Sequence, residues 1–99
     1  MTVCTIQDFQ TLDPNITVVW SVEKAEEYLR REYIGKIEPH YCQDGKVIDI
    51  LIIPSKNHNN VWYAHCVTED FLPEEEWPQY EDDETVDADF VIREVEIWT

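Results

Sequence analysis

The sequence predicts an α+β domain in which one helix packs against an antiparallel sheet of four to five strands. One segment, residues 22–34, has helical periodicity, and four others show the alternation or apolar density typical of strands. A chain of 99 residues has the length of one domain, so we expect a single domain over residues 1–99. A helix packed on an antiparallel sheet is one of the few layer arrangements that bury the apolar faces of both elements.

Two short strands are predicted before the helix. Residues 3–6 form a β-like run, and a turn signal with Asp, Pro and Asn follows at residues 12–15. Residues 16–20 alternate, which predicts the second strand. Its two faces carry Ile16, Val18 and Trp20 on one side and Thr17 and Val19 on the other.

The predicted helix, about residues 22–34, has a start signal, an apolar stripe and a stop signal. Ser21 offers an N-cap oxygen, and Gly35 ends the helix. The apolar residues recur at spacings of three and four: they are Val22, Ala25, Leu29 and Tyr33, with Tyr28 beside them. We expect two ion pairs at i, i+4, between Glu26 and Arg30 and between Glu27 and Arg31.

The chain after the helix predicts a β-meander. Residues 36–43 are extended, and Pro39 favours an edge position for them, before the hairpin signal Asp44-Gly45. Residues 46–53 are apolar on both faces except at Asp49, which predicts a central strand covered on both sides.

Two further strands complete the predicted sheet. Residues 61–68 place Trp62, Ala64 and Cys66 on one face. Residues 88–98 recover alternation after a long acidic stretch and predict the last strand.

Charge is unevenly distributed. The chain has 22 acidic and 7 basic residues, net charge −15. Residues 1–68 carry a net charge of −3, whereas residues 69–99 carry thirteen acids and only Arg93, a net charge of −12. Solubility needs a net charge of only about 2–8 in magnitude. The surplus indicates a long-range field that attracts a basic partner and repels nucleic acid and anionic membranes.

The most unusual segment, residues 69–89, mixes eleven acids with aromatic residues and has no base and no glycine. It is either a solvated loop whose aromatic rings pack on the sheet, a disordered stretch, or an anionic ridge that docks on a nucleic-acid-binding surface. On a ridge, the aromatic residues would be the apolar anchors that dominate interface energies. The candidate partner-binding residues are Glu74, Glu75, Glu76, Trp77, Tyr80, Glu81, Asp82, Asp83, Glu84, Glu94 and Glu96.

Metal-binding motifs are incomplete. His40 and Cys42 share a strand face, but His65 and Cys66 point to opposite faces, so only one of them could join a zinc site. An EF-hand pattern starting at Asp83 has Ala instead of the required Gly at its sixth position. We therefore expect no metal and no cofactor.

Catalytic motifs are also missing from the sequence. An acidic surrounding raises the pKa of thiols and weakens a cysteine nucleophile. The only serines are Ser21, a predicted cap, and Ser55, and two glycines cannot form a phosphate-binding loop. We expect no catalytic residues, and so not an enzyme.

The N-terminal residues do not have the pattern of a signal peptide, and no apolar run approaches the roughly 20 residues of a membrane span. Three widely spaced cysteines, Cys4, Cys42 and Cys66, fit reduced thiols better than a disulfide framework. These features predict a cytoplasmic protein.

The sequence therefore favours a small acidic inhibitor that blocks a basic protein which handles nucleic acid, such as a nuclease or an effector complex. By analogy of class and composition alone, small phage anti-defence factors such as anti-CRISPR and anti-restriction proteins are often nucleic-acid mimics of this kind. Two alternatives stay open. One is an immunity protein or antitoxin that neutralises a basic nuclease toxin, and the other is a non-catalytic subunit or adaptor of a larger complex.

Overall fold

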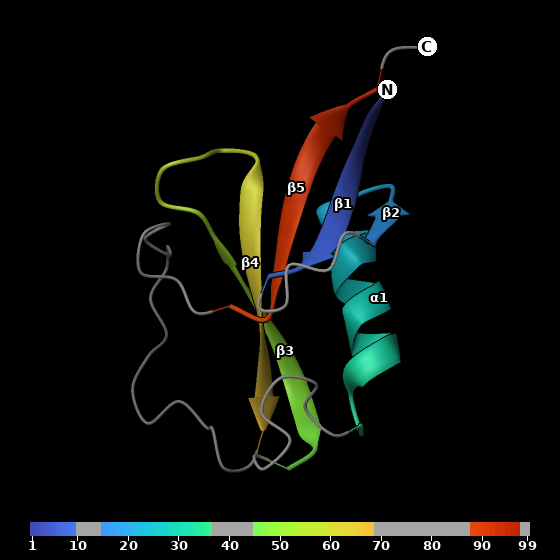
Figure 1. Ribbon diagram of the computed structural model, residues 1–99, viewed down its shortest axis with the longest axis vertical. Helices are drawn as coiled ribbons and strands as arrows, with labels where there is room; N and C mark the ends of the chain where they lie inside the picture. The colour runs from blue at the N-terminus through green and yellow to red at the C-terminus, as the bar shows by residue number, and fades with distance from the viewer. Residues whose placement is uncertain (10–14, 37–44, 69–87, 98–99) are drawn as a thin grey trace.

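A computed structural model describes residues 1–9, 15–36, 45–68 and 88–97. In these residues one helix, α1 (Val22–Tyr33), lies against one face of a five-stranded antiparallel sheet (Figure 1), which confirms the predicted fold class. The strands are β1 (Thr2–Asp8), β2 (Ile16–Val19), β3 (Val47–Pro54), β4 (Val61–Thr68) and β5 (Phe90–Glu96). The predicted turn at residues 12–15, apart from Asn15, and the extended residues 37–43 lie outside the described residues.

The last strand in the chain lies in the middle of the sheet. The strand order is β2-β1-β5-β4-β3, and β5 pairs with β1 from Phe90↔Asp8 to Glu96↔Thr2. On its other side β5 pairs with β4 only from Phe90↔Ala64 to Arg93↔Val61. Of the predicted meander over residues 36–68, the described part is confirmed, since β3 and β4 pair antiparallel.

The expected central position of residues 46–53 is wrong, because β3 lies at an edge of the described sheet. The strand is rich in apolar residues because both of its faces are covered by other residues, and not because it lies between two other strands. Ile50, on the helix face, and Ile53, on the opposite face, are both buried. An irregularity between Val47 and Asp49 leaves Ile48 43% exposed.

Helix α1 forms as its sequence signals predict. The Ser21 hydroxyl accepts a hydrogen bond from the backbone N–H of Lys24 at 3.2 Å, and Gly35 adopts a positive φ of 86° just after the C-cap, a conformation that favours glycine. Ala25 and Leu29 are fully buried. They pack over β1, β5, β4 and β3 in a core that also contains Cys4, Ile6, Val47, Ile50, Ala64, Cys66, Phe90 and Ile92.

One of the two predicted helical ion pairs forms. Arg30 binds Glu26, as expected, with Nη2 3.0 Å from Oε1. The expected pair between Glu27 and Arg31 is wrong, because Glu27 binds Lys24 at 3.1 Å. Arg31 lies 3.6 Å from Glu32 and contacts a tyrosine ring. Both arrangements use exposed side chains, for which alternative partners differ little in energy.

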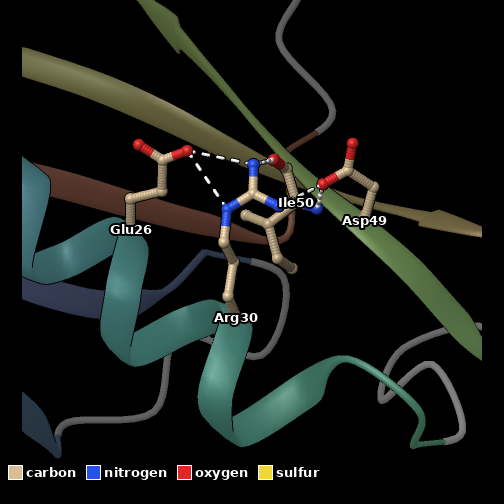
Figure 2. Close-up of polar contacts among 4 residues, drawn as sticks. All are labelled: Glu26, Arg30, Asp49 and Ile50. Atoms are coloured by element: carbon tan, nitrogen blue, oxygen red, sulfur yellow. Dashed lines mark hydrogen bonds and ion pairs between the residues drawn. The ribbon is translucent and has the colours of Figure 1, made fainter.

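Arg30 also joins the helix to β3 (Figure 2). Its guanidinium donates to the Asp49 carboxylate and to the Ile50 carbonyl oxygen, the latter at 3.1 Å. The hydrogen bond to Glu26 is the largest of the effects that raise the pKa of Arg30. A five-donor planar group can bind several oxygens at once, so one side chain fixes the C-terminal half of α1 over the edge strand.

Candidate functional site

Two of the predicted partner-binding residues, Glu94 and Glu96, lie on β5 and are exposed. They stand opposite Cys4 and Thr2 of β1, two residues apart and therefore on one face, with roughly 6.6 Å between successive positions. The other nine predicted residues lie outside the described residues: Glu74, Glu75, Glu76, Trp77, Tyr80, Glu81, Asp82, Asp83 and Glu84.

One acid of the helix acts on the same buried thiol as one acid of β5. Burial, together with the charges of Glu94 and Glu23, raises the pKa of the Cys4 thiol. Glu23 belongs to the first turn of α1 and Glu94 to β5. Helix and sheet thus each supply a carboxylate whose charge reaches Cys4.

The opposite face of the same strands carries several exposed apolar residues. Trp20, Val18 and Ile16 are 69%, 59% and 51% exposed. Val18 pairs with Thr5, and Thr5 pairs with Arg93 of β5. Val95 is two residues beyond Arg93 and therefore lies on the same face as Val18. We call these four residues the Trp20 patch. Exposed apolar residues that gather in this way mark interaction surfaces more often than isolated ones do.

Trp20 borders a small hollow in this patch. A cavity of about 160 Å³ is lined by Val3, Val18, Val19 and Trp20. Strand β2 is also an edge of the described sheet and has only four residues. A tryptophan beside a hollow at a sheet edge has the features of an interface anchor, and an edge strand can pair with a further strand.

Most of the excess negative charge lies in three segments outside the described residues. The described residues, which we call the scaffold, hold the ends of these segments. The described residues contain all seven bases and nine of the 22 acids, a net charge of −2. The remaining thirteen acids lie in residues 10–14, 37–44 and 69–87, which contain no base. The described scaffold is therefore nearly neutral.

The ends of the two longer acidic segments meet at one end of β3. The backbone N–H of Val47 donates to the Lys36 carbonyl at 2.8 Å, and Val47 pairs with Thr68. Lys36 precedes residues 37–44, and Thr68 precedes residues 69–87.

Residues 69–87 return to the sheet at a well-defined place. The backbone N–H of Asp89 donates to the Ala64 carbonyl, and that of Phe9 donates to the Asp89 carbonyl, both at 3.0 Å. The largest acidic segment therefore leaves from and returns to fixed positions on β4 and beside β1.

The described residues give no support to a metal site or a membrane span. Among them, no three His, Cys, Asp or Glu side chains are placed to hold a metal ion, while His40 and Cys42 lie outside these residues. His65 and Cys66 are both buried in β4. The described helix is too short and too polar to cross a bilayer.

Comparison with protein-family models, with curated proteins and with solved structures finds no match.

The sequence predicted the two faces of residues 16–20 but not which face is exposed. Both faces of this strand carry valine, so alternation alone could not decide it. The exposure of Ile16, Val18 and Trp20 depends on where α1 packs, and α1 covers Val19 instead.

Proposed function

We propose that this protein is a small acidic binding protein that inhibits a basic protein which handles nucleic acid. Its carboxylates would occupy a cationic groove that otherwise binds phosphates, as a nucleic-acid mimic does. By analogy with that class, a phage anti-defence factor, such as an anti-CRISPR or anti-restriction protein, is the favoured identity. The proposal includes a cytoplasmic location, no catalysis and no direct binding to nucleic acid.

The observation that carries this proposal is the division of charge. A scaffold of net charge −2 holds the ends of segments that contain thirteen acids and no base. A uniformly acidic surface would serve solubility, whereas acids concentrated in a few anchored segments favour recognition. Such a concentration raises the rate of encounter with a cationic surface.

The test is capture of a partner from host lysate at low salt, its release at high salt, and measurement of association with the purified partner. Replacing Glu74, Glu75 and Glu76 together with Gln should slow association and reduce its salt dependence. The control replaces two other acids with Gln, namely Glu27 and Glu32 of α1. An affinity that is equal at low and high salt would exclude the electrostatic mechanism.

Inhibition itself needs a second readout. The purified partner should lose its nucleic-acid binding or cleavage in proportion to the complex formed. Protection of cells from a basic nuclease toxin would instead identify an immunity protein or antitoxin, which uses the same charges.

A role as a subunit or adaptor is the second candidate function, and the Trp20 patch favours it. Trp20→Ala should weaken such an assembly by about 2 kcal/mol or more, and the loss should not depend on salt. The control is Ile48→Ala, which changes an exposed apolar residue of β3.

A further inference from the structure

A cavity lies between the C-terminal half of α1 and the strands β1 and β2. Its volume is about 140 Å³, about ten times the least space that one buried water needs. The polar residues that line it are Asp8, Asn15, Thr17, Tyr28 and Tyr33. Ile6, Leu29 and Phe90 contribute apolar walls.

The strand register explains why a carboxylate faces this cavity. Cys4, Ile6 and Asp8 alternate along the helix face of β1, and Cys4 and Ile6 are buried in the core. Asp8 is the next position on that face and pairs with Phe90. The apolar face of β1 therefore ends in an acid at the edge of the core.

The cavity has a negative electrostatic character. Among the residues that the structure describes, none that lines the cavity is basic. Burial raises the pKa of Tyr33, and the charges of Asp8 and Glu32 act in the same direction, so Asp8 is close enough to act on the phenol. Tyr33 is the last residue of α1, where the helix dipole also favours a cation.

Two tyrosine rings complete the surroundings. The Tyr33 ring packs on Phe90 with 4.9 Å between centroids, which restrains it beside the cavity. Tyr28 already has a guanidinium near its ring, since Cζ of Arg31 lies 5.8 Å from the centroid. Arg31 is largely exposed and does not line the cavity. Arginine, more than lysine, combines carboxylate binding with stacking on aromatic rings.

We infer that this cavity receives the guanidinium group of an arginine side chain, which donates hydrogen bonds to Asp8 and lies against Tyr28 and Tyr33. The supply of that side chain by a basic partner rests on the proposed function, whereas recognition of the guanidinium group does not. The same chemistry would also fit a free guanidine or amine, and the experiment separates these sources.

The test uses the protein alone, titrated with methylguanidinium and followed by NMR. The resonances of Asn15 and Thr17 should shift and saturate, with a Kd in the millimolar range expected of so small a ligand. Methylurea, which is neutral and similar in shape, should give no saturable shift. Equal shifts with both compounds, or a shift that does not saturate, would overturn the inference.

Variants locate the interaction. Asp8→Asn should weaken methylguanidinium binding about tenfold, and Thr17→Val should weaken it less. Glu27→Gln is the matched control, because it removes an exposed carboxylate of α1 that does not line the cavity, and it should leave the Kd unchanged. Arg31→Ala should strengthen binding, since it removes a competing cation from Tyr28. Equal losses in Asp8→Asn and Glu27→Gln would show that only the overall charge of the protein matters, and would overturn the assignment.

The last arm separates the two sources of the guanidinium group. N-acetylarginine methylamide, which resembles an arginine within a protein, should bind as tightly as methylguanidinium. A preference of more than tenfold for agmatine or spermidine would contradict a partner side chain. Because these titrations need no partner protein, they succeed or fail separately from the salt-dependent capture that tests the proposed function.

Discussion

The carboxylate of Asp89 accepts a 2.7 Å hydrogen bond from the backbone N–H of Cys66. This contact lies where the pairing of β4 with β5 stops, since the ladder ends at Ala64↔Phe90 while β4 continues to Thr68. Asp89 is buried, so its side chain takes over the role of a missing strand partner. Buried backbone groups need such partners because leaving one unpaired is costly.

Asp89→Ala should therefore lower the free energy of unfolding by about 2 kcal/mol, since the Cys66 N–H loses its acceptor. Asp89→Asn should cost less, because the amide oxygen can still accept. Urea unfolding measures both, with the exposed Glu96→Ala as control, for which we expect a change within about 0.5 kcal/mol. Equal effects of Asp89→Ala and Glu96→Ala would show that the contact contributes nothing to stability.

Removal of the Arg30 side chain should loosen α1 from the edge strand. Arg30→Ala loses ion pairs with Glu26 and Asp49 and a hydrogen bond to Ile50. The side chain is 40% exposed, so solvent screens these charges, and we expect a loss of about 1–2 kcal/mol in all. Urea unfolding at rising salt should show the loss shrinking. Arg31→Ala, at a more exposed site, is the control, and an equal loss there would argue against a specific link to β3.

The Cys4 thiol should make stability depend on alkaline pH. Its folded-state pKa is raised above the unfolded value of 9.0, so its contribution is complete below about pH 9 and is lost as the pH rises through the folded pKa. Stability measured from pH 9 upward should thus fall more steeply in the parent chain than in Cys4→Ala. Tyr33, whose pKa is raised from 10.0, adds a similar loss at higher pH in both proteins. Parallel pH profiles would exclude the effect of Cys4.

The same burial should protect Cys4 and Cys66 from thiol reagents. Neither forms a disulfide, and both are buried. In a Cys42→Ser background the native protein should react with iodoacetamide far more slowly than the urea-unfolded protein, since only the exposed thiolate is nucleophilic. Mass spectrometry of the labelled chain measures this. Rapid labelling of either thiol in the native protein would show that the core opens readily.

Two apolar residues on adjacent elements should differ sharply in their effect on stability. Leu29 is fully buried on the sheet-facing side of α1, and Leu29→Ala should cost about 2–5 kcal/mol because it leaves a cavity. Ile48, at the irregularity in β3, is 43% exposed, and Ile48→Ala should cost less than about 1 kcal/mol. Thermal unfolding of the two variants tests the contrast. Similar losses would place Ile48 in the core and contradict its exposure.

Local signals predicted the helix well, because Ser21, the apolar stripe and Gly35 all act within a few residues of the chain. They could not predict the order of the strands, since the place of β5 between β1 and β4 depends on contacts across most of the chain. For the same reason the pattern of residues 46–53 was compatible with a central strand, although the described sheet has it at an edge.

The sequence also predicted some features of the candidate site and missed others. Glu94 and Glu96 lie exposed on a strand, as their spacing predicted, while their role in partner binding stays a prediction. The Trp20 patch and the cavity at Asp8 were not, because each depends on which faces α1 covers. The acids of residues 74–84 remain predictions from composition and lie outside the described residues.

The central place of β5 has a consequence for folding. In the described sheet β5 is the strand that connects the β1-β2 hairpin to the β3-β4 hairpin. Each hairpin uses contacts between neighbours in the chain, but the two hairpins can join only after β5, which follows the other described strands in the sequence. During translation the two halves would emerge as separate hairpins with exposed apolar edges, and pairs such as Thr2↔Glu96 close a very long loop. Folding slower than that of a helical protein of this size, with a transient tendency to aggregate, is the expected result.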